Sequence, residues 1–273
     1  MGTEAQTLRR WRAVDTAPDP HEFTRYLEQL SEHPLIRALN RARLAAADVR
    51  PGSTVLDLGC GIGSDALMLA EAVGPSGHVY AVDRSRVMTE ATARRARERS
   101  LTITCQECDA ASLPFPDKVF DVVWLERVLM HVVSPLDVLT EIRRVLRGGG
   151  QLGVSEPDSG ALMVSEGGDP QLAELVEQRW SQGIAHPRIG RLLEGQARVA
   201  GFTNVWAEPK FASTADFELA STSMRWCTLL NSLVNDGEVS QSRADAWLRT
   251  VEAEARAGQM ILWVPRFDLV ARR

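Results

Sequence analysis

The sequence predicts an α/β protein with a doubly wound, seven-stranded and mostly parallel sheet that carries helical cap insertions. Two observations predict this class. Short apolar runs alternate with longer segments of helical periodicity over residues 53–155, which is the pattern of βαβ units. The segment 55–63, VLDLGCGIG, joins an apolar strand to a helix through a glycine-rich turn. Such turns bind nucleotide cofactors at the carboxyl ends of strands.

The apolar periodicity places the elements in order. Residues 20–47 have the spacing of two helices and lead through Pro51 and Gly52 into the first strand. We expect parallel strands near residues 53–58, 78–83, 101–105, 119–124 and 150–155, and helices at 64–72, 86–99 and 135–146, the last one stopped by the glycines at 148–150. After residue 156 we expect helices at about 170–182 and 189–200, a strand at 204–212, helices at about 215–235 and 240–257, and a final strand at 260–271.

This order of elements predicts the domain organisation. We expect an N-terminal helical cap at residues 1–50 and a core at 51–273. Helical insertions at about 157–200 and 213–258 are expected to form a lid over the substrate. A chain of 273 residues is long enough to bury one full core with these additions.

Charge and apolar content exclude several classes of protein. A net charge of −5 argues against binding to nucleic-acid phosphates. The arginines at 94–99 stand among glutamates, as is typical of a solvated helix face. No apolar run approaches the roughly 20 residues that cross a bilayer, and the N-terminus lacks the apolar stretch of a signal peptide. We therefore expect a cytoplasmic monomer or homodimer that acts on a small molecule, with no nucleic-acid partner and no membrane span.

The cysteines do not predict a metal or redox centre. Cys105 and Cys108 have C-x-x-C spacing, but no second pair or histidine cluster accompanies them. The pair also ends a strand, whereas a thioredoxin-like motif opens a helix. We expect no metal.

The glycine turn and the next strand predict a nucleotide cofactor. Gly59, Gly61 and Gly63 allow unusual backbone angles and a close approach of the ligand to the main chain. Asp83 ends the following strand 20 residues after Gly63, where a carboxylate would hold ribose hydroxyls. The turn alone leaves the cofactor open, because residues 61–66, GIGSDA, also satisfy the G-x-G-x-x-A pattern of nicotinamide dinucleotide (NAD) sites.

Further motifs resemble those of the class I S-adenosyl-L-methionine (SAM) dependent methyltransferases. Residues 55–63 match the family's first motif, V-L-D-x-G-C-G-x-G, and AVD at 81–83, CDA at 108–110 with LPF at 113–115, FDVV at 120–123 and EIRRVLRGGG at 141–150 follow in order. These matches cover residues 53–158. One departure is Gly148, where many relatives have proline before the paired glycines; it changes a turn and no chemistry.

The resemblance implies roles for the cofactor residues. Asp57 would lie near the methionine amino end of SAM, Asp83 would accept from the ribose hydroxyls, and Asp109 would accept from the adenine amino group. An ionised carboxylate accepts such hydrogen bonds strongly. Met88 either covers the adenine face or packs in the core. The full set of cofactor residues that we expect is Tyr26, Asp57, Gly59, Cys60, Gly61, Gly63, Asp83, Arg84, Met88, Asp109, Ala110, Glu126 and Arg127.

The acceptor pocket should follow the fourth and fifth strands, because ligands of such sheets bind outside the carboxyl ends of the strands. Residues 126–131, ERVLMH, and 156–159, EPDS, stand there. Many relatives carry the motifs E-R-x-L-x-H and E-P-D-W at these positions. In this chain Ser159 stands where they have tryptophan, so a large side chain is missing from the expected pocket wall. The residues that we expect around the substrate are Met130, His131, Glu156, Asp158, Met163, Met224 and Trp226.

Methyl transfer from a sulfonium is an in-line displacement. A site that aligns the two reactants and excludes water accelerates it. A base is needed only if the acceptor must lose a proton. His131 is the first candidate for that catalytic role and Glu126 the second. His131 has the alternative of positioning the turn before Pro135 or packing against the methionine moiety. Arg127 either holds a carboxylate or pairs with a neighbouring glutamate.

The expected function is methyl transfer from SAM, with S-adenosyl-L-homocysteine (SAH) as product, to a small, largely apolar or aromatic acceptor such as a bacterial specialised metabolite. Two alternatives keep the cofactor: an enzyme of the same fold that steers a cyclisation or rearrangement, and a noncatalytic SAM-binding partner subunit. The undamaged motifs disfavour the second. Nucleic-acid methylation is also disfavoured, because no N/D-P-P-Y/F motif follows the fourth strand.

Overall fold

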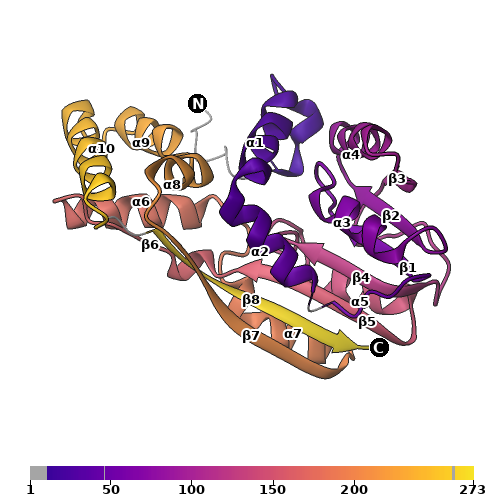
Figure 1. Ribbon diagram of the computed structural model, residues 1–273. Coiled ribbons are helices and arrows are strands. Elements are labelled where there is room, and N and C mark those ends of the chain that lie inside the picture. Colours follow the sequence, from indigo (N-terminus) through magenta and orange to yellow (C-terminus); the bar gives the residue numbers. More distant parts are fainter. Residues whose placement is uncertain (1–10, 46, 260–261) are drawn as a thin grey trace.

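The fold is built on one twisted sheet with helices on both faces (Figure 1). The computed structural model describes residues 11–45, 47–259 and 262–273, so parts of the expected cap at 1–50 and of the expected strand at 260–271 lie outside the described residues. The strands are β1 (Thr54–Leu58), β2 (His78–Asp83), β3 (Ile103–Glu107), β4 (Phe120–Glu126), β5 (Leu146–Pro157), β6 (Met163–Val164), β7 (Thr203–Thr214) and β8 (Leu262–Arg272). The helices are α1 (His21–Glu32), α2 (Pro34–Leu44), α3 (Ser64–Val73), α4 (Arg86–Glu98), α5 (Pro135–Val145), α6 (Pro170–Gln182), α7 (Ile189–Val199), α8 (Phe217–Met224), α9 (Trp226–Asn235) and α10 (Gln241–Arg256).

The sheet has the predicted doubly wound, mostly parallel order. Strands β3, β2, β1, β4 and β5 are parallel neighbours, and β8 runs antiparallel between β5 and β7. The sheet has one strand more than the seven predicted. The two-residue β6 pairs with the beginning of β8, with Met163 opposite Trp263. A segment of two residues carries no periodicity that a sequence pattern could detect.

Alternation of side chains along the central strands gives the sheet two apolar faces. Val55 of β1 packs with α3 on one face, whereas Leu56 and Leu58 pack with α5 and α7 on the other. Both faces are therefore covered, as the near-continuous apolar runs of parallel strands require. The carboxyl ends of these strands form one edge, and α1 and α2 lie above it, in contact with α3, α4 and α8 (Figure 1).

Capping explains where most helices begin. Ser85, Ser134, Asp169, Asp216 and Ser240 each accept a hydrogen bond from the backbone N–H three residues later and so cap α4, α5, α6, α8 and α10. Helix α3 differs, because it follows Gly63 and has no side chain at its N-cap. Its first turn is thus open to a ligand and to carboxylates from neighbouring elements.

Two predicted elements end or break elsewhere. Helix α5 stops at Val145 because Leu146 is extended and pairs with Phe120, so the glycines at 148–150 belong to β5 and do not stop the helix. The predicted helix at 215–235 is two helices, since Arg225 between them has a left-handed φ of +49°. The Arg225 guanidinium pairs with Glu22 of α1 and lies 5.9 Å from the centre of the Tyr26 ring. These contacts offset the cost of that conformation.

The helices α6, α8, α9 and α10 belong to the segments predicted to form a lid, and we refer to them as the lid; they pack around a hydrophobic cluster of their own. Trp226 is at its centre, fully buried, with its ring 5.4 Å from that of Trp247 and 5.6 Å from that of Phe217. Trp226 was predicted to line the acceptor pocket, but tertiary packing buries its side chain inside the lid, and it is not among the residues that line the cavity described below. Within the described residues, no helix combines the length and apolar content needed to cross a bilayer.

Replacing Trp226 by alanine tests its place in the lid core. Truncating a fully buried tryptophan should lower the free energy of unfolding by about 3–5 kcal/mol, measured by urea denaturation. Trp206→Ala is the matched control, because Trp206 is 69% exposed on β7 and should shift that free energy by less than about 0.5 kcal/mol. Equal effects of the two substitutions would contradict the assignment.

Candidate active site

A cavity of about 430 Å³ lies at the carboxyl ends of β1, β2 and β4 and is covered by residues of α1, α2 and α8. Fifteen of the residues predicted from the sequence line it together. They are Tyr26, Asp57, Gly59, Cys60, Gly61, Asp83, Arg84, Met88, Asp109, Ala110, Glu126, Arg127, Met130, His131 and, from the lid, Met224. The cavity thus contains both residues predicted for the cofactor and residues predicted for the substrate.

The glycine turn is held tightly against the neighbouring strands. The N–H groups of Gly59 and Cys60 donate to the Val82 carbonyl at 2.7 and 2.9 Å. A Cβ on Gly59 would stand 2.4 Å from Val128 Cγ2, and the residue has a φ of +73°, so only glycine fits. Gly63, also at a left-handed φ, does not line the cavity itself and instead sets the start of α3.

Asp83 is anchored by the turn that it faces. Its carboxylate accepts from Gly61 N–H at 3.0 Å and from Ser85 N–H at 2.9 Å, and burial raises its pKa against these donors. Asp109, farther along the same edge, accepts from Ala111 N–H at 2.9 Å. Met88 is only 2% exposed and packs in a core cluster with Phe23 and Val14. It also lines the cavity, and its contact with the adenine stays a prediction.

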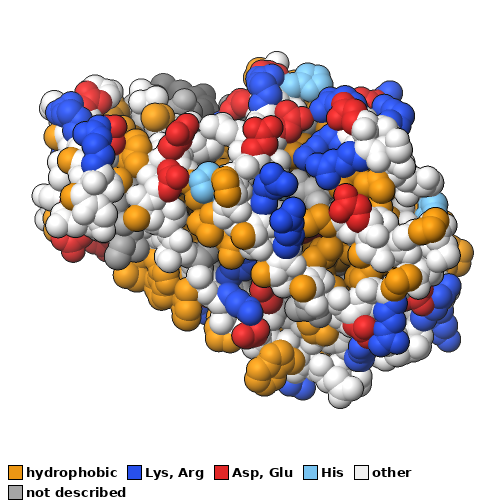
Figure 2. Space-filling model, viewed as in Figure 1, with side chains coloured by type: hydrophobic (Ala, Val, Ile, Leu, Met, Phe, Trp, Pro, Cys, Tyr) orange, Lys and Arg blue, Asp and Glu red, His pale blue; other side chains and the backbone are white. Residues whose placement is uncertain are grey.

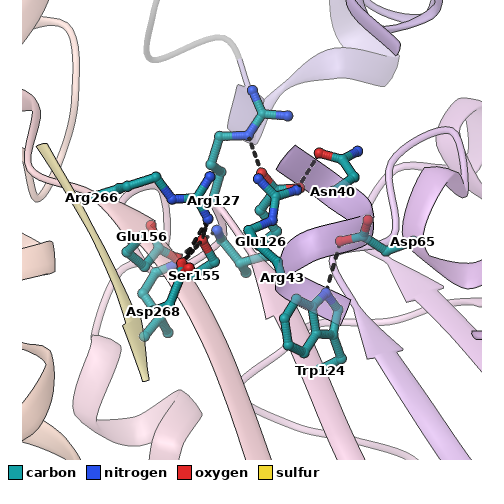
Figure 3. A network of polar contacts seen from close by, with 12 residues as sticks. Asn40, Arg43, Asp65, Trp124, Glu126, Arg127, Ser155, Glu156, Arg266 and Asp268 are labelled. Atoms are coloured by element: carbon teal, nitrogen blue, oxygen red, sulfur yellow. Dashed lines mark hydrogen bonds and ion pairs between the residues drawn. The ribbon is translucent and has the colours of Figure 1, made fainter. Parts of the chain in front are cut away.

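Three carboxyl groups line the cavity near one another: Asp57 and Asp65, which are buried, and Glu126, whose side chain is 14% exposed. Glu126 pairs with Arg43 of α2 at 2.7 Å and with Arg127 at 3.4 Å (Figure 3). Burial raises the pKa of Glu126, but the two guanidinium groups outweigh burial and leave it below its usual value. Arg127 therefore forms the ion pair with a neighbouring glutamate, while its predicted hold on a carboxylate of the cofactor or substrate stays a prediction.

Asp65 was not predicted as a site residue. It lies in the first turn of α3, its Oδ2 accepts from Trp124 Nε1 at 2.8 Å, and its Oδ1 has no hydrogen-bond partner among the described residues. Asp57 has one such unpartnered oxygen, Oδ2. The signal that could have identified Asp65 is its position two residues after Gly63, in a turn where the helix dipole favours an anion.

His131 lines the cavity beside the N-terminal segment. Burial, Arg127 and Arg12 lower its pKa to about 3, so its imidazole is neutral near neutral pH. Its backbone carbonyl accepts from Arg12, and its ring centre is 6.1 Å from that of Trp11. Tyr26 donates from its hydroxyl to the Ser223 carbonyl at 3.0 Å, which joins α1 to α8 across the cavity.

Three other residues predicted around the substrate do not line the cavity. Glu156 is fully buried, and its Oε1 accepts from the N–H groups of Val128 and Leu129 at 2.7 and 2.6 Å. Asp158 is buried and paired with Arg191 of α7, with one contact of 2.9 Å. Met163 of β6 is 53% exposed, and Figure 2 shows apolar side chains gathered at the surface where Figure 1 places β6 and the start of β8. Glu156, Asp158 and Met163 thus lie outside this cavity, unlike the other residues predicted around the substrate that line it.

Several residues that line the cavity were missed. Most of them have apolar side chains that resemble ordinary core residues in the sequence, and only the fold shows which residues face the cavity. They include Trp11, Arg12, Val14, Leu27, Leu30, Ile36, Asn40, Trp180, Ile184 and Val264.

Glu156 predicts a dependence of stability on pH. Burial raises its pKa to about 8, despite the backbone donors at Leu129, Val128 and Met130. Because the folded pKa lies above the unfolded one, its contribution is complete below the unfolded pKa of about 4.3 and is lost as the pH rises through about 8. Glu156→Gln keeps the acceptor for Val128 and Leu129 but does not ionise. We expect urea denaturation to show a smaller loss of stability between pH 5 and 9 in this variant. Parallel profiles of variant and wild type would contradict the prediction.

Comparison with known proteins agrees with these features. Residues 56–154 match the methyltransferase domain family described as Methyltransf_11. The chain is 33% identical over 240 residues to an uncharacterised 37.1 kDa protein in transposon TN4556 of Streptomyces fradiae, with 88% of this chain and 69% of that protein covered.

A second relative is the ubiquinone/menaquinone biosynthesis C-methyltransferase UbiE of Burkholderia mallei, 37% identical over 122 residues, which are 45% of this chain and 50% of that enzyme. Among solved structures, the [4+2]-cyclase SpnF aligns with a TM-score of 0.53 and 25% identity over 87% of this chain and 80% of that one. With the glycine turn, the acidic strand ends and the sheet order in place, the chain belongs to the class I SAM-dependent methyltransferase family.

Proposed function

We propose that this protein transfers the methyl group of SAM to a small, largely apolar or aromatic organic acceptor. The observation that carries the proposal is one cavity with two chemically different ends. Carboxylates at the ends of β1 and β2 line one part of it, and aromatic and aliphatic side chains from α6 and the turn after it, from α8 and from β8 line another. Such a cavity suits a polar cofactor next to an apolar substrate.

The residues at the polar end fit SAM. Asp57 has a buried, unpartnered oxygen that a ligand ammonium group would satisfy. Asp83 retains acceptor capacity for ribose hydroxyls beside its two backbone donors. The N-terminus of α3, without a side chain at its N-cap, meets the glycine turn at the same place. Asp109 and Ala110 lie farther along this edge for the adenine.

The apolar end favours an acceptor with little charge. Trp180, Ile184, Met224 and Val264 supply its walls. Ser159 also lines the cavity and occupies little volume where many relatives have tryptophan, which leaves room for a bulky acceptor. Exclusion of water at this end would keep the nucleophile and the methyl group aligned without competing hydrolysis.

The protonation state of His131 determines which catalytic role it can take. A histidine with a pKa of about 3 is a weak base, so proton abstraction from the acceptor gains little from it near neutral pH. As a neutral imidazole it retains one donor and one acceptor nitrogen. We infer that His131 orients the acceptor or the methionine end of the cofactor, and that rate enhancement comes from alignment.

Cofactor binding and methyl transfer test the proposal. Isothermal titration calorimetry should detect binding of SAH and none of NAD, and Asp83→Ala should weaken SAH binding by about 1.5–3 kcal/mol, the range for a hydrogen bond to a charged group. Radiolabelled SAM should then methylate members of a panel of quinone-like, isoprenoid and aromatic acceptors. Binding of NAD without binding of SAH would overturn the proposal.

The lid should determine acceptor affinity through Met224. Met224 is 2% exposed and lines the cavity, so Met224→Ala should raise KM for the acceptor by the equivalent of about 1–3 kcal/mol while the Kd of SAH stays unchanged. Met163→Ala is the matched control, since Met163 is exposed and lies off the cavity. A change of KM in the control alone would place the acceptor elsewhere.

A further inference from the structure

The three neighbouring carboxyl groups of the cavity lining come from different parts of the fold. Asp57 is in β1, Asp65 in the first turn of α3 and Glu126 at the end of β4. Asp57 and Asp65 are 3% and 6% exposed, and all three line the cavity. Figure 3 shows Asp65 joined to Trp124, and Glu126 beside Arg43 and Arg127.

The two arginines that form ion pairs beside these three carboxyl groups both pair with the same one. Arg43 and Arg127 both pair with Glu126, at 2.7 and 3.4 Å. Asp65 receives one hydrogen bond, from Trp124, and Asp57 receives one from the Ala66 N–H. Among the described residues, Asp65 Oδ1 and Asp57 Oδ2 have no partner. Two buried carboxyl groups of the cavity lining thus have one oxygen each without a hydrogen-bond partner, which is costly for the ionised forms.

A bound proton reduces this cost while the cavity is empty. Burial and the charge of Glu126 raise the pKa of Asp65 to about 6, against Arg43, Trp124 and Arg127, which lower it. Burial, Asp65, Glu126 and Asp83 raise the pKa of Asp57, opposed by the Ala66 N–H. Protonated Asp65 can also donate to the ionised Glu126.

We propose that Asp65, together with Asp57, forms a cation site that exchanges a bound proton for the ammonium group of the cofactor, so that cofactor binding releases a proton to solvent. This inference rests on the proposed function and assigns a binding residue, Asp65, and a regulation by pH. The ammonium group brings one positive charge and the released proton removes one, so the net charge of the carboxyl groups with their bound cation does not change.

The surroundings of Asp65 suit such an exchange. Its place in the first turn of α3 stabilises the anion that remains when the proton leaves. The hydrogen bond from Trp124 holds the carboxyl group in place in either state. Below the pKa of the cluster, protons and ligand compete. The affinity for an ammonium-bearing ligand should therefore fall by up to about tenfold per unit of pH.

Calorimetry of the intact protein tests the exchange. SAH is titrated at pH 6 in two buffers of different ionisation enthalpy, and the difference in observed enthalpy gives the number of protons released. We expect release with SAH and none with 5′-deoxy-5′-(3-carboxypropylthio)adenosine, which lacks only the α-amino group. Equal enthalpies for SAH in both buffers would overturn the inference and leave the proposed function intact. Failure of SAH to bind at all would overturn both.

Substitution then assigns the proton to Asp65. Asp65→Asn keeps an acceptor oxygen for Trp124 but does not titrate, so it should reduce the proton release and flatten the dependence of SAH affinity on pH between 5 and 7. Asp137→Asn is the matched control, because Asp137 is an exposed carboxyl group of the same cavity wall, and it should release as many protons as the wild type. Unchanged release in Asp65→Asn, or equal weakening of SAH and of the deamino analogue, would reduce Asp65 to a structural partner of Trp124.

Discussion

The buried ion pair between Arg43 and Glu126 is the contact on which the enclosure of the cavity depends. It joins α2 to the end of β4, and its two side chains are only 6% and 14% exposed. Removing either partner would leave a buried charge without compensation, which is far more costly than the pair is stabilising. The N-terminal helices are thereby fixed over the strand ends, and Asn40 of the same helix supports Arg43 through a hydrogen bond.

Other charged contacts extend this attachment along the N-terminal segment. Asp15 accepts from the N–H of Arg86 at 2.8 Å and so reaches the first turn of α4, while Arg12 donates to the carbonyls of His131 and Val132. Glu22 and Tyr26 connect α1 to the junction of α8 and α9. The proposed cofactor and acceptor ends of the cavity therefore share one cover, held by side chains whose partners are distant in the sequence.

This distance explains how much of the protein could be predicted from the sequence. The turn from Asp57 to Gly63 and the acidic ends of β1 and β2 depend on local chemistry, so their motifs identified the cofactor end of the cavity and the sheet order. Glu156 and Trp226 were assigned to the substrate because they follow strand ends or lie in the insertions. Whether such a side chain faces a ligand or a neighbouring helix depends on packing between remote elements, which one sequence does not display. Asp65 was missed for the same reason, since the two carboxyl groups that act on it, Asp57 and Glu126, come from strands β1 and β4.

The separate hydrophobic cluster of the lid has a consequence for how such a protein can diverge. Trp226 and Trp247 pack with residues of α6, α8, α9 and α10, whereas the glycine turn and Asp83 belong to the sheet and its own cores. Substitutions that repack the lid therefore change the shape offered to the acceptor while the half that holds the cofactor stays intact. A lineage that carries this architecture can explore new acceptors by drift in one module, without passing through forms that have lost the methyl donor.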